Sequence, residues 1–414
     1  MNNKANYVRY NVDTHHHGLF IKEARIRKDK RLKDVAAGIC DVSYLSKIEA
    51  GLVIPAPDIF VQLVQKLEIV MPYKHRKHFV KDIREIIYAN EGVGISGYLA
   101  SENLHEYELQ LGRFFQAVLS DKQILAMKLM KNIDQLVLHF NLEEKQLYFL
   151  FCGIYFFKTY DWEKGKKAFK TSFDLTFKLD EDPLLYYHFS RYYFQTQNMS
   201  LGFAFINLAI DKFQKVYAKK WVFKCMAIRI REHLKNNEID NAIMHSEELE
   251  SIVTSNSEQS VWNEFFNLQG LIYEKQQLMQ QAEQNLLQSV DLENLVANEN
   301  HLLDLVRFYY HQDARAKFLE LIEKIDFVNI SKGGQLLLDF YYYKVADVPS
   351  EELELFLKTD ALPYATRTLN AREFEIYTKE ITRLYRQRMR HKKVADAYYD
   401  WERFRDGLEL NGII

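Results

Sequence analysis

Cysteine, proline and glycine are scarce in this chain, and each scarcity narrows what the protein can be. The three cysteines, Cys40, Cys152 and Cys225, are too scattered for a disulfide framework and have no metal-ligand spacing. Isolated cysteines of this kind are typical of a reducing compartment. Six prolines and fifteen glycines in 414 residues favour long helices over an architecture of strands and tight turns.

Signals for membranes and for catalysis are also missing. No uninterrupted apolar run approaches the length of about 18 residues that a membrane span needs. Residues 1–11 are polar and lack the apolar core of a signal peptide, so we expect a cytoplasmic protein without a membrane segment. The sequence has no nucleophile elbow, phosphate-binding loop, dinucleotide fingerprint or zinc-ligand spacing. We therefore expect no enzymatic activity, no cofactor and no metal site.

The chain is long and rich in apolar residues. At 414 residues it exceeds one ordinary core, and its hydrophobic content of 48% is ample for burial in several domains or in a repeat array. From about Ser101 onward the apolar spacing is helical and shows no strand-like alternation. The fold class that we predict is all-α.

Charge is distributed unevenly although the net charge is only −2. Between Phe20 and Lys33 seven basic residues stand against Glu23 and Asp29, which leaves a local excess of five positive charges. The basic residues are Lys22, Arg25, Arg27, Lys28, Lys30, Arg31 and Lys33. A basic segment of this size on a nearly neutral body indicates a small DNA-binding module.

Residues 19–67 have the pattern of a helix-turn-helix. Asp41 can accept hydrogen bonds from the first free N–H groups of a short helix, and Gly51 suits the left-handed residue that ends it. Leu45 and Ile48 give this helix one apolar face. A second short amphipathic helix lies upstream, with apolar positions at Leu32, Val35, Ala36 and Ile39. Two short helices joined tightly and flanked by longer ones are typical of a helix-turn-helix.

These residues resemble the lambda-repressor-like, or XRE, DNA-binding domain. The resemblance rests on Ile21, Lys22, Arg25, Val35, Ala36, residues 42–51, Pro55, Asp58 and Ile59. More narrowly, residues 38–49 are similar to the peptide-sensing regulators of the RRNPP family, typified by PlcR, NprR and Rgg. The close match covers about fifty residues, and the rest of the chain resembles this family in architecture.

The expected recognition helix follows Asp41. With Leu45 and Ile48 inward, its outward positions at the N-terminal end are Val42, Ser43, Ser46 and Lys47. Lys47 can donate to guanine, Ser43 to a base or phosphate, and Val42 can pack on a thymine methyl group. Tyr44 is expected to contact the DNA backbone.

Two further roles follow from the resemblance. It implies that Arg25 and Glu49 pair across the first and third helices, so that both are structural and do not read DNA. The second helix of this family usually opens with Thr or Ser followed by Gln, which contacts phosphate, whereas this chain has Arg31 and Leu32. Arg31 or Lys33 is therefore expected to supply the phosphate contact.

We predict four segments, which are a polar arm (1–17), the helix-turn-helix domain (18–70), a linker helix with a glycine hinge (71–97), and a helical repeat domain for peptide binding and dimerisation (98–414). The arm ends in three histidines at residues 15–17, which we interpret as solvated and not as a metal site. The linker helix is expected to start at Pro72, and the glycine-rich residues 92–97 form the expected hinge.

Three stretches of the last segment share a pattern in which a small residue is followed by an aromatic three residues later and another small residue twelve residues later. The stretches are Gly153, Phe156 and Gly165, then Ser190, Tyr193 and Gly202, then Gly270, Tyr273 and Ala282. This pattern is similar to the tetratricopeptide (TPR) repeat, which implies stacked helix pairs in a right-handed α-superhelix. Residues 302–324, 336–357 and 374–399 are interpreted as degenerate units.

Stacked helix pairs form a concave inner face that can hold an extended peptide. The repeat register projects eight residues toward that face, namely Lys158, Tyr187, Arg191, Lys224, Arg231, Glu264, Asn267 and Glu274. Asn267 is the strongest candidate, because an amide can both donate to and accept from a peptide backbone.

The sequence thus predicts a cytoplasmic transcription regulator that binds a palindromic operator in double-stranded DNA as a homodimer and is controlled by a short signalling peptide. Two alternatives stay open. The first is a TPR interaction protein that binds or sequesters phosphorelay proteins. The second is a phage or mobile-element regulator with the same architecture and mechanism.

Overall fold

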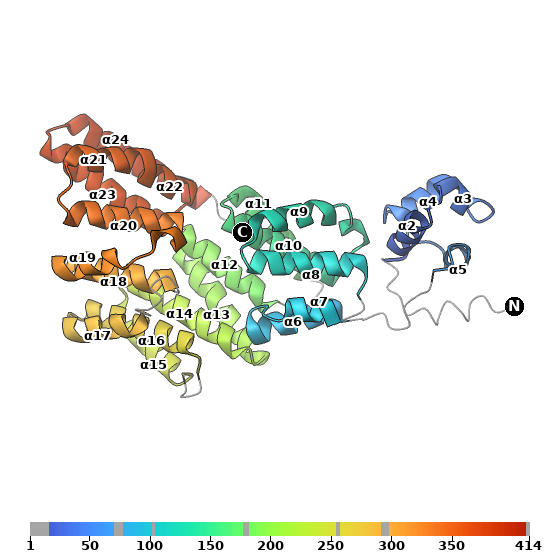
Figure 1. The fold of residues 1–414 in the computed structure, drawn as a ribbon, viewed down its shortest axis with the longest axis horizontal. Coiled ribbons are helices and arrows are strands. Elements are labelled where there is room, and N and C mark those ends of the chain that lie inside the picture. The colour runs from blue at the N-terminus through green and yellow to red at the C-terminus, as the bar shows by residue number, and fades with distance from the viewer. Residues whose placement is uncertain are drawn as a thin grey trace. The chain divides into compact units, whose positions relative to one another are not determined.

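A computed structural model describes residues 16–69, 78–101, 104–176, 182–253, 257–290 and 298–410, and in these ranges all regular secondary structure is helical (Figure 1). The all-α prediction is confirmed. The chain divides after Leu185 into two compact units. Among the described residues, the helices are either too short or too polar to cross a membrane.

Four helices form the N-terminal module, α2 (His17–Arg27), α3 (Leu32–Ala36), α4 (Val42–Glu49) and α5 (Pro57–Lys66). Their core consists of side chains with no exposed surface, including Ile21, Val35, Leu45, Ile48, Phe60 and Leu63. The apolar spacing of the sequence produces this core, because residues three or four apart lie on one face of a helix.

The ends of α4 agree only in part with the sequence prediction. Gly51 has a φ of +71°, as expected, and its N–H donates to the Ile48 carbonyl at 3.0 Å. The N–H of Leu52 donates to the Lys47 carbonyl at 2.9 Å, which completes a Schellman closure. Asp41 occupies the position before the helix, but its side chain makes no capping hydrogen bond. That part of the prediction is wrong.

Two expectations for neighbouring segments are also wrong. Helix α3 ends at Ala36, and Ile39 lies in a turn in which Gly38 adopts a φ of +78°. His16 and His17 are buried and not part of a solvated arm, and His16 Nε2 lies 2.8 Å from Glu144 Oε2. The rest of the predicted arm, residues 1–15, lies outside the described residues.

The expected linker and hinge are packed helices in the structure. Helix α6 (Phe79–Asn90) buries its apolar face, and Arg84 on it donates to Asp182 at 3.0 Å and to Gln146 at 2.6 Å. Residues 91–94 of the expected glycine hinge form a short turn, and Gly97 lies inside α7 (Ile95–Ser101). Whether this turn acts as a hinge stays a prediction. The predicted start at Pro72 lies outside the described residues.

The remaining helices follow one another as antiparallel pairs. In the first unit they are α8 (Glu106–Leu119), α9 (Gln123–Ile133), the 3-10 turn η2 (Val137–His139), α10 (Leu142–Lys158) and α11 (Trp162–Thr176). From the boundary onward they are α12 (Pro183–Gln195), α13 (Met199–Lys215), α14 (Lys219–Lys235), α15 (Ile239–Glu250), α16 (Gln259–Lys275), α17 (Met279–Ser289), α18 (Glu299–His311), α19 (Arg315–Glu323), the turn η4 (Phe327–Asn329), α20 (Lys332–Val345), α21 (Ser350–Phe356), the π-turn η5 (Leu357–Ala361), α22 (Leu362–Arg367), α23 (Ala371–Gln387) and α24 (His391–Leu410).

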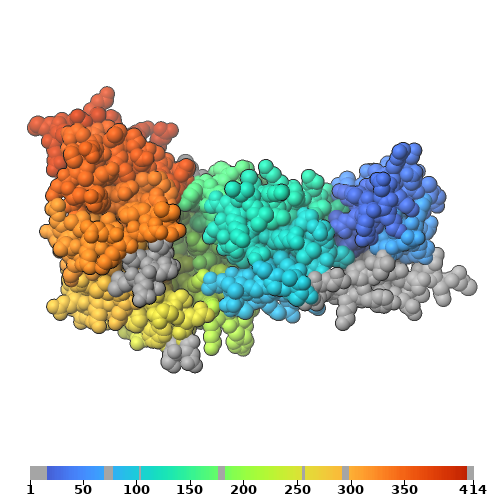
Figure 2. Space-filling model, in the orientation of Figure 1, coloured from blue at the N-terminus to red at the C-terminus, as the bar shows by residue number. Residues whose placement is uncertain are grey.

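The small residues of the sequence repeat lie where two helices of a pair touch. A Cβ atom on Gly153 would overlap the ring of Phe169, and one on Gly202 would lie 2.5 Å from the ring of Phe194. A Cβ on Gly270 would lie 2.7 Å from Leu286. Side chains fill the gaps that the ribbons leave between neighbouring helices (Figure 2). The structure confirms the helix pairs, and it adds the pair α8–α9 and helix α22, which the sequence pattern missed.

Candidate functional site

The exposed face of α4 carries the residues that the sequence predicts to read DNA. Val42 is 45% exposed, and Ser43, Ser46 and Lys47 are exposed as well. Tyr44 is half-buried. Because Leu45 and Ile48 are buried against the module, these outward side chains are held at fixed positions along one helix face. Their contact with DNA stays a prediction.

Arg25 and Glu49 form the predicted pair. Arg25 Nε lies 2.7 Å from Glu49 Oε1 and Arg25 Nη2 lies 2.8 Å from Glu49 Oε2, which is a bidentate bridge from α2 to α4. The hydrogen bonding of Arg25 to the Glu49 carboxylate, which accepts from it, raises the pKa of Arg25. Arg25 Nη1 also donates to the Lys30 carbonyl at 3.0 Å. The guanidinium is therefore engaged inside the module.

Arg31 and Lys33 lie at the start of α3. Both are exposed, and Arg31 precedes the helix in an extended conformation. A cation at this place can reach a phosphate group beside the recognition helix. Among the predicted DNA contacts, these two are the candidates for backbone binding.

The second candidate site lies in the second unit and is built around Arg231 of α14. Its Nε donates to Glu264 Oε1 at 3.0 Å, and its Nη1 donates to Asp304 Oδ2 at 3.0 Å. Its Nη2 donates to Asn267 Oδ1 at 2.6 Å. Three helices, α14, α16 and α18, thus meet at one guanidinium. The structure brings together three of the predicted groove residues, Arg231, Glu264 and Asn267.

Further charged groups extend this cluster along α18. Arg307 Nη1 lies 3.2 Å from Asp304 Oδ1, and Arg307 Nη2 lies 3.0 Å from Glu274 Oε2. His301 Nε2 lies 2.8 Å from Glu264 Oε2. Burial alone would raise the pKa of Glu264, but Arg231 and His301 lower this pKa to about 2. The cluster is a connected network of ion pairs.

Asn267 occupies a special position in the network. Its side chain has no exposed surface, and its Oδ1 accepts from Arg231. Its Nδ2 has no hydrogen-bond partner among the described residues. Buried amide donors are normally satisfied, so an unpartnered one in a charged cluster indicates a place for an acceptor from a ligand.

Of the other predicted groove residues, Tyr187, Arg191 and Lys224 form a separate group. Tyr187 is buried edge-on against Trp221, with ring centroids 5.2 Å apart. Arg191 lies over the Tyr187 ring, and Lys224 lies over the Trp221 ring. Glu274 joins the main cluster through Arg307.

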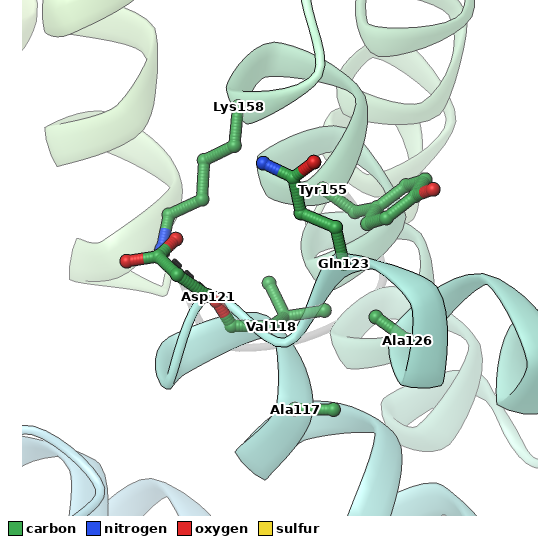
Figure 3. Close-up of a pocket in the computed structure, with 7 residues that line it drawn as sticks. All are labelled: Ala117, Val118, Asp121, Gln123, Ala126, Tyr155 and Lys158. Carbon is green, nitrogen blue, oxygen red and sulfur yellow. Dashed lines mark hydrogen bonds and ion pairs between the residues drawn. The ribbon is translucent and has the colours of Figure 1, made fainter. Parts of the chain in front are cut away.

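Lys158 is in the first unit. It donates to the Val118 carbonyl at 2.9 Å and to Asp121 at 2.6 Å, beside a small recess that Tyr155 and Gln123 also line (Figure 3). Sequence reasoning missed His301, Asp304 and Arg307. His301 directly precedes the first degenerate unit (302–324), and Asp304 and Arg307 lie inside it, where the sequence gives no register to project.

Comparisons with known proteins find similarity for the N-terminal module in sequence and for the helical repeats in structure. A helix-turn-helix family model matches residues 21–70. A comparison with curated protein sequences finds no match. Within the described residues, the helical repeats resemble solved structures at low sequence identity.

A Rap protein in complex with competence and sporulation factor superposes with a TM-score of 0.62 at 12% identity, covering 81% of this chain and 98% of that one. The protein NprR in complex with its cognate peptide NprX gives 0.57 at 16% identity, covering 77% and 100%. Aspartyl phosphate phosphatase F from Bacillus subtilis gives 0.50 at 14% identity, covering 95% of each chain. At these identities the likeness establishes a shared TPR-like fold.

Proposed function

We propose that this chain, which joins a helix-turn-helix domain to the TPR-like fold found in NprR and Rap, is a peptide-controlled transcription regulator of the cytoplasm. The observation that carries the proposal is the coexistence of two sites in one chain. One is an exposed recognition face on α4, and the other is a charged cluster with an unused donor on Asn267. The proposal gives the chain a regulatory role and no catalytic one.

The DNA-binding half of the proposal rests on residues 18–70. Lys47 and Ser43 donate to base edges, Val42 packs on a thymine methyl group, and Arg31 or Lys33 binds phosphate. A single recognition helix covers only a few base pairs, so we propose that two copies bind a palindromic operator as a homodimer. The Arg25–Glu49 bridge fixes α4 against α2, which supports the proposal that α4 presents its exposed face to DNA in one defined orientation.

The peptide-binding half rests on the cluster around Arg231. An extended peptide offers one carbonyl acceptor per residue, and Asn267 Nδ2 supplies a buried donor for one of them. The ion pairs around Asn267 hold its side chain in place, so that the donor is oriented before a ligand arrives. The TPR-like fold shared with NprR, which was solved with a bound peptide, supports the same interpretation.

The first test is selection of binding sites from random duplex DNA by the full-length protein. We expect enrichment of a two-fold symmetric sequence, and we expect the Lys47→Ala variant to relax the preference at one position of each half-site. Lys164→Ala, which changes an exposed lysine on α11, is the matched control and should select the same sequence. Failure to enrich any sequence would contradict the DNA-binding half of the proposal.

The second test is calorimetric binding of peptides selected from a random library. We expect Asn267→Ala to abolish or strongly weaken binding, whereas Asn285→Ala, which changes a half-buried asparagine of α17 outside the cluster, should leave it unchanged. Peptides that bind both variants equally would contradict the assigned groove.

An interaction with phosphorelay proteins is the second candidate function. The fold likeness to an aspartyl phosphate phosphatase, which extends over 95% of both chains, is the observation that favours it. A phosphorelay protein that binds the full-length chain, together with failure to enrich any DNA sequence, would support this candidate over the first.

A further inference from the structure

In the cluster around Arg231 the carboxylate acceptors are satisfied, whereas one amide donor is not. Both oxygens of Glu264 accept, one from Arg231 and one from His301. Both oxygens of Asp304 are also taken, one by Arg231 and one by Arg307. The unused group at the centre is a donor, Asn267 Nδ2. A ligand that completes this cluster must therefore present acceptors.

A third arginine, Arg372, belongs to the same cluster. Arg372 lies at the start of α23, is exposed, and makes no hydrogen bond or ion pair with any residue that the structure describes. It is close enough to Arg307, Asp304 and Tyr341 to interact with them electrostatically. Desolvation of the Arg372 guanidinium and the positive charge of Arg307 lower the pKa of Arg372.

None of the described carboxylates near Arg372 forms an ion pair with it. Each is either engaged by another basic residue or only partly ionised. Asp304 is held by two other arginines, and Glu232 accepts from Lys235 at 2.6 Å. The neighbouring Glu373 is half-buried, and burial raises its pKa to about 7, so that it is only partly ionised in neutral solution. Arg372 thus stands beside a desolvated network without a hydrogen bond or ion pair to any described residue, where an anion from outside would gain most.

We propose that Arg372 binds a carboxylate of the peptide ligand while Asn267 binds a carbonyl of its backbone. The inference rests on the proposed peptide-binding function and names the chemistry that the groove selects. The planar guanidinium matches a carboxylate in a bidentate arrangement. The carboxylate is either the C-terminus of the peptide or an Asp or Glu side chain, and both sources offer the same geometry.

The test uses the full-length protein and short random peptides in three forms, namely with a free C-terminus, with a C-terminal amide, and with a free C-terminus but no Asp or Glu. We expect binders from the first form to lose about ten-fold or more in affinity either on amidation or on replacement of their acidic residues. Loss on amidation identifies the C-terminus as the source, and loss on replacement identifies a side chain.

Variants of Arg372 connect this loss to one residue. Arg372→Gln should lower the affinity for the peptide with the carboxylate by the same factor. It should cause no further loss of affinity for the peptide that lacks the carboxylate, since the two changes remove the same interaction. Arg372→Lys should recover only part of the affinity, because an ammonium group lacks the planar fork. Arg386→Gln, an exposed arginine on the same helix, is the control and should bind as the parent does.

Thermal unfolding is the control for folding. If Arg372→Gln unfolds at the same temperature as the parent protein, a loss of affinity does not come from a loss of fold. Peptides that depend on Asn267 but ignore both Arg372 and their own carboxylates would overturn this inference and leave the proposed function intact. A library that yields no binder in any form would contradict both.

Discussion

At the scale of single residues, the partners of a charged side chain decide its role. Arg25 and Lys47 are both basic and both lie in the N-terminal module, yet Arg25 is held by two oxygens of Glu49 whereas Lys47 is exposed on α4. A phosphate cannot engage the two nitrogens of Arg25 that already bind Glu49 without breaking that bridge. The two residues therefore give different mutational outcomes.

Lys47→Ala should weaken specific DNA binding by about 1–3 kcal/mol, which is the usual worth of one base contact. The stability of the fold should hardly change, because the side chain is exposed. Fluorescence anisotropy with the selected duplex measures the affinity, and Lys164→Ala serves as the control. Unchanged affinity and specificity would show that α4 is not the recognition helix.

Arg25→Ala should instead destabilise the module by about 3 kcal/mol or more, because it leaves the buried carboxylate of Glu49 without its partner. The double variant Arg25→Ala with Glu49→Ala should cost less than the sum of the single changes. Chemical denaturation of the full-length protein, followed through the first transition, measures both. A single variant as stable as the parent would contradict a structural role for the bridge.

Glu373 gives the chain a pH-dependent stability. Its pKa is raised from 4.5 to about 7 by burial, so the native state holds a proton that the unfolded state releases. Stability from this group is present below about pH 4.5 and is lost as the pH rises to about 7. Glu373→Gln should thus raise the free energy of unfolding by about 1–3 kcal/mol at pH 8 and by much less at pH 5. Equal effects at both pH values would contradict the assignment, and Glu352→Gln, which changes an exposed carboxylate, is the control.

At the scale of helices, the pairs are set by small residues at the points of closest approach. Gly153 of α10 faces the ring of Phe169 on α11, whereas Gly165 of α11 has more room, since a Cβ there would lie 3.5 Å from Phe156. Both positions belong to the same sequence repeat, and only the first is closed to a larger side chain.

The two glycines should respond to alanine in opposite directions. Gly153→Ala should destabilise the first unit by about 1–3 kcal/mol, because the Phe169 ring must move. Gly165→Ala should be neutral or stabilise by up to about 1 kcal/mol, because alanine favours the helix and meets only ordinary contacts. Denaturant midpoints of the two variants provide the measurement, and equal destabilisation by both would contradict the packing described here.

Elements with strong local signals could be predicted from the sequence. The apolar period of α4 and α5, the closure at Gly51 and the small-residue pattern of the repeats all depend on neighbours within a turn or two. Helix α6, by contrast, packs through Arg84 onto Asp182, a partner nearly a hundred residues away that no local pattern indicates. The repeat register likewise placed Arg231, Glu264 and Asn267 on one face. It missed Asp304, Arg307 and Arg372, because these residues lie in or beside degenerate units that give no register.

At the scale of the whole molecule, control by a peptide requires a difference in affinity. A peptide can alter DNA binding only if it binds more tightly to the DNA-competent arrangement of the homodimer than to the incompetent one, or the reverse. The coupling is reciprocal, so bound DNA must change the affinity for the peptide by the same factor. The sign of the change distinguishes a co-activating peptide from an inducing one.

The measurement that tests this account most directly is the affinity of the full-length protein for its selected duplex, with and without a saturating selected peptide. We expect a change of about five-fold or more, equal to the change in peptide affinity caused by DNA. We also expect Asn267→Ala to abolish the change while leaving basal DNA binding intact. An affinity for DNA that is the same with and without bound peptide would contradict the account.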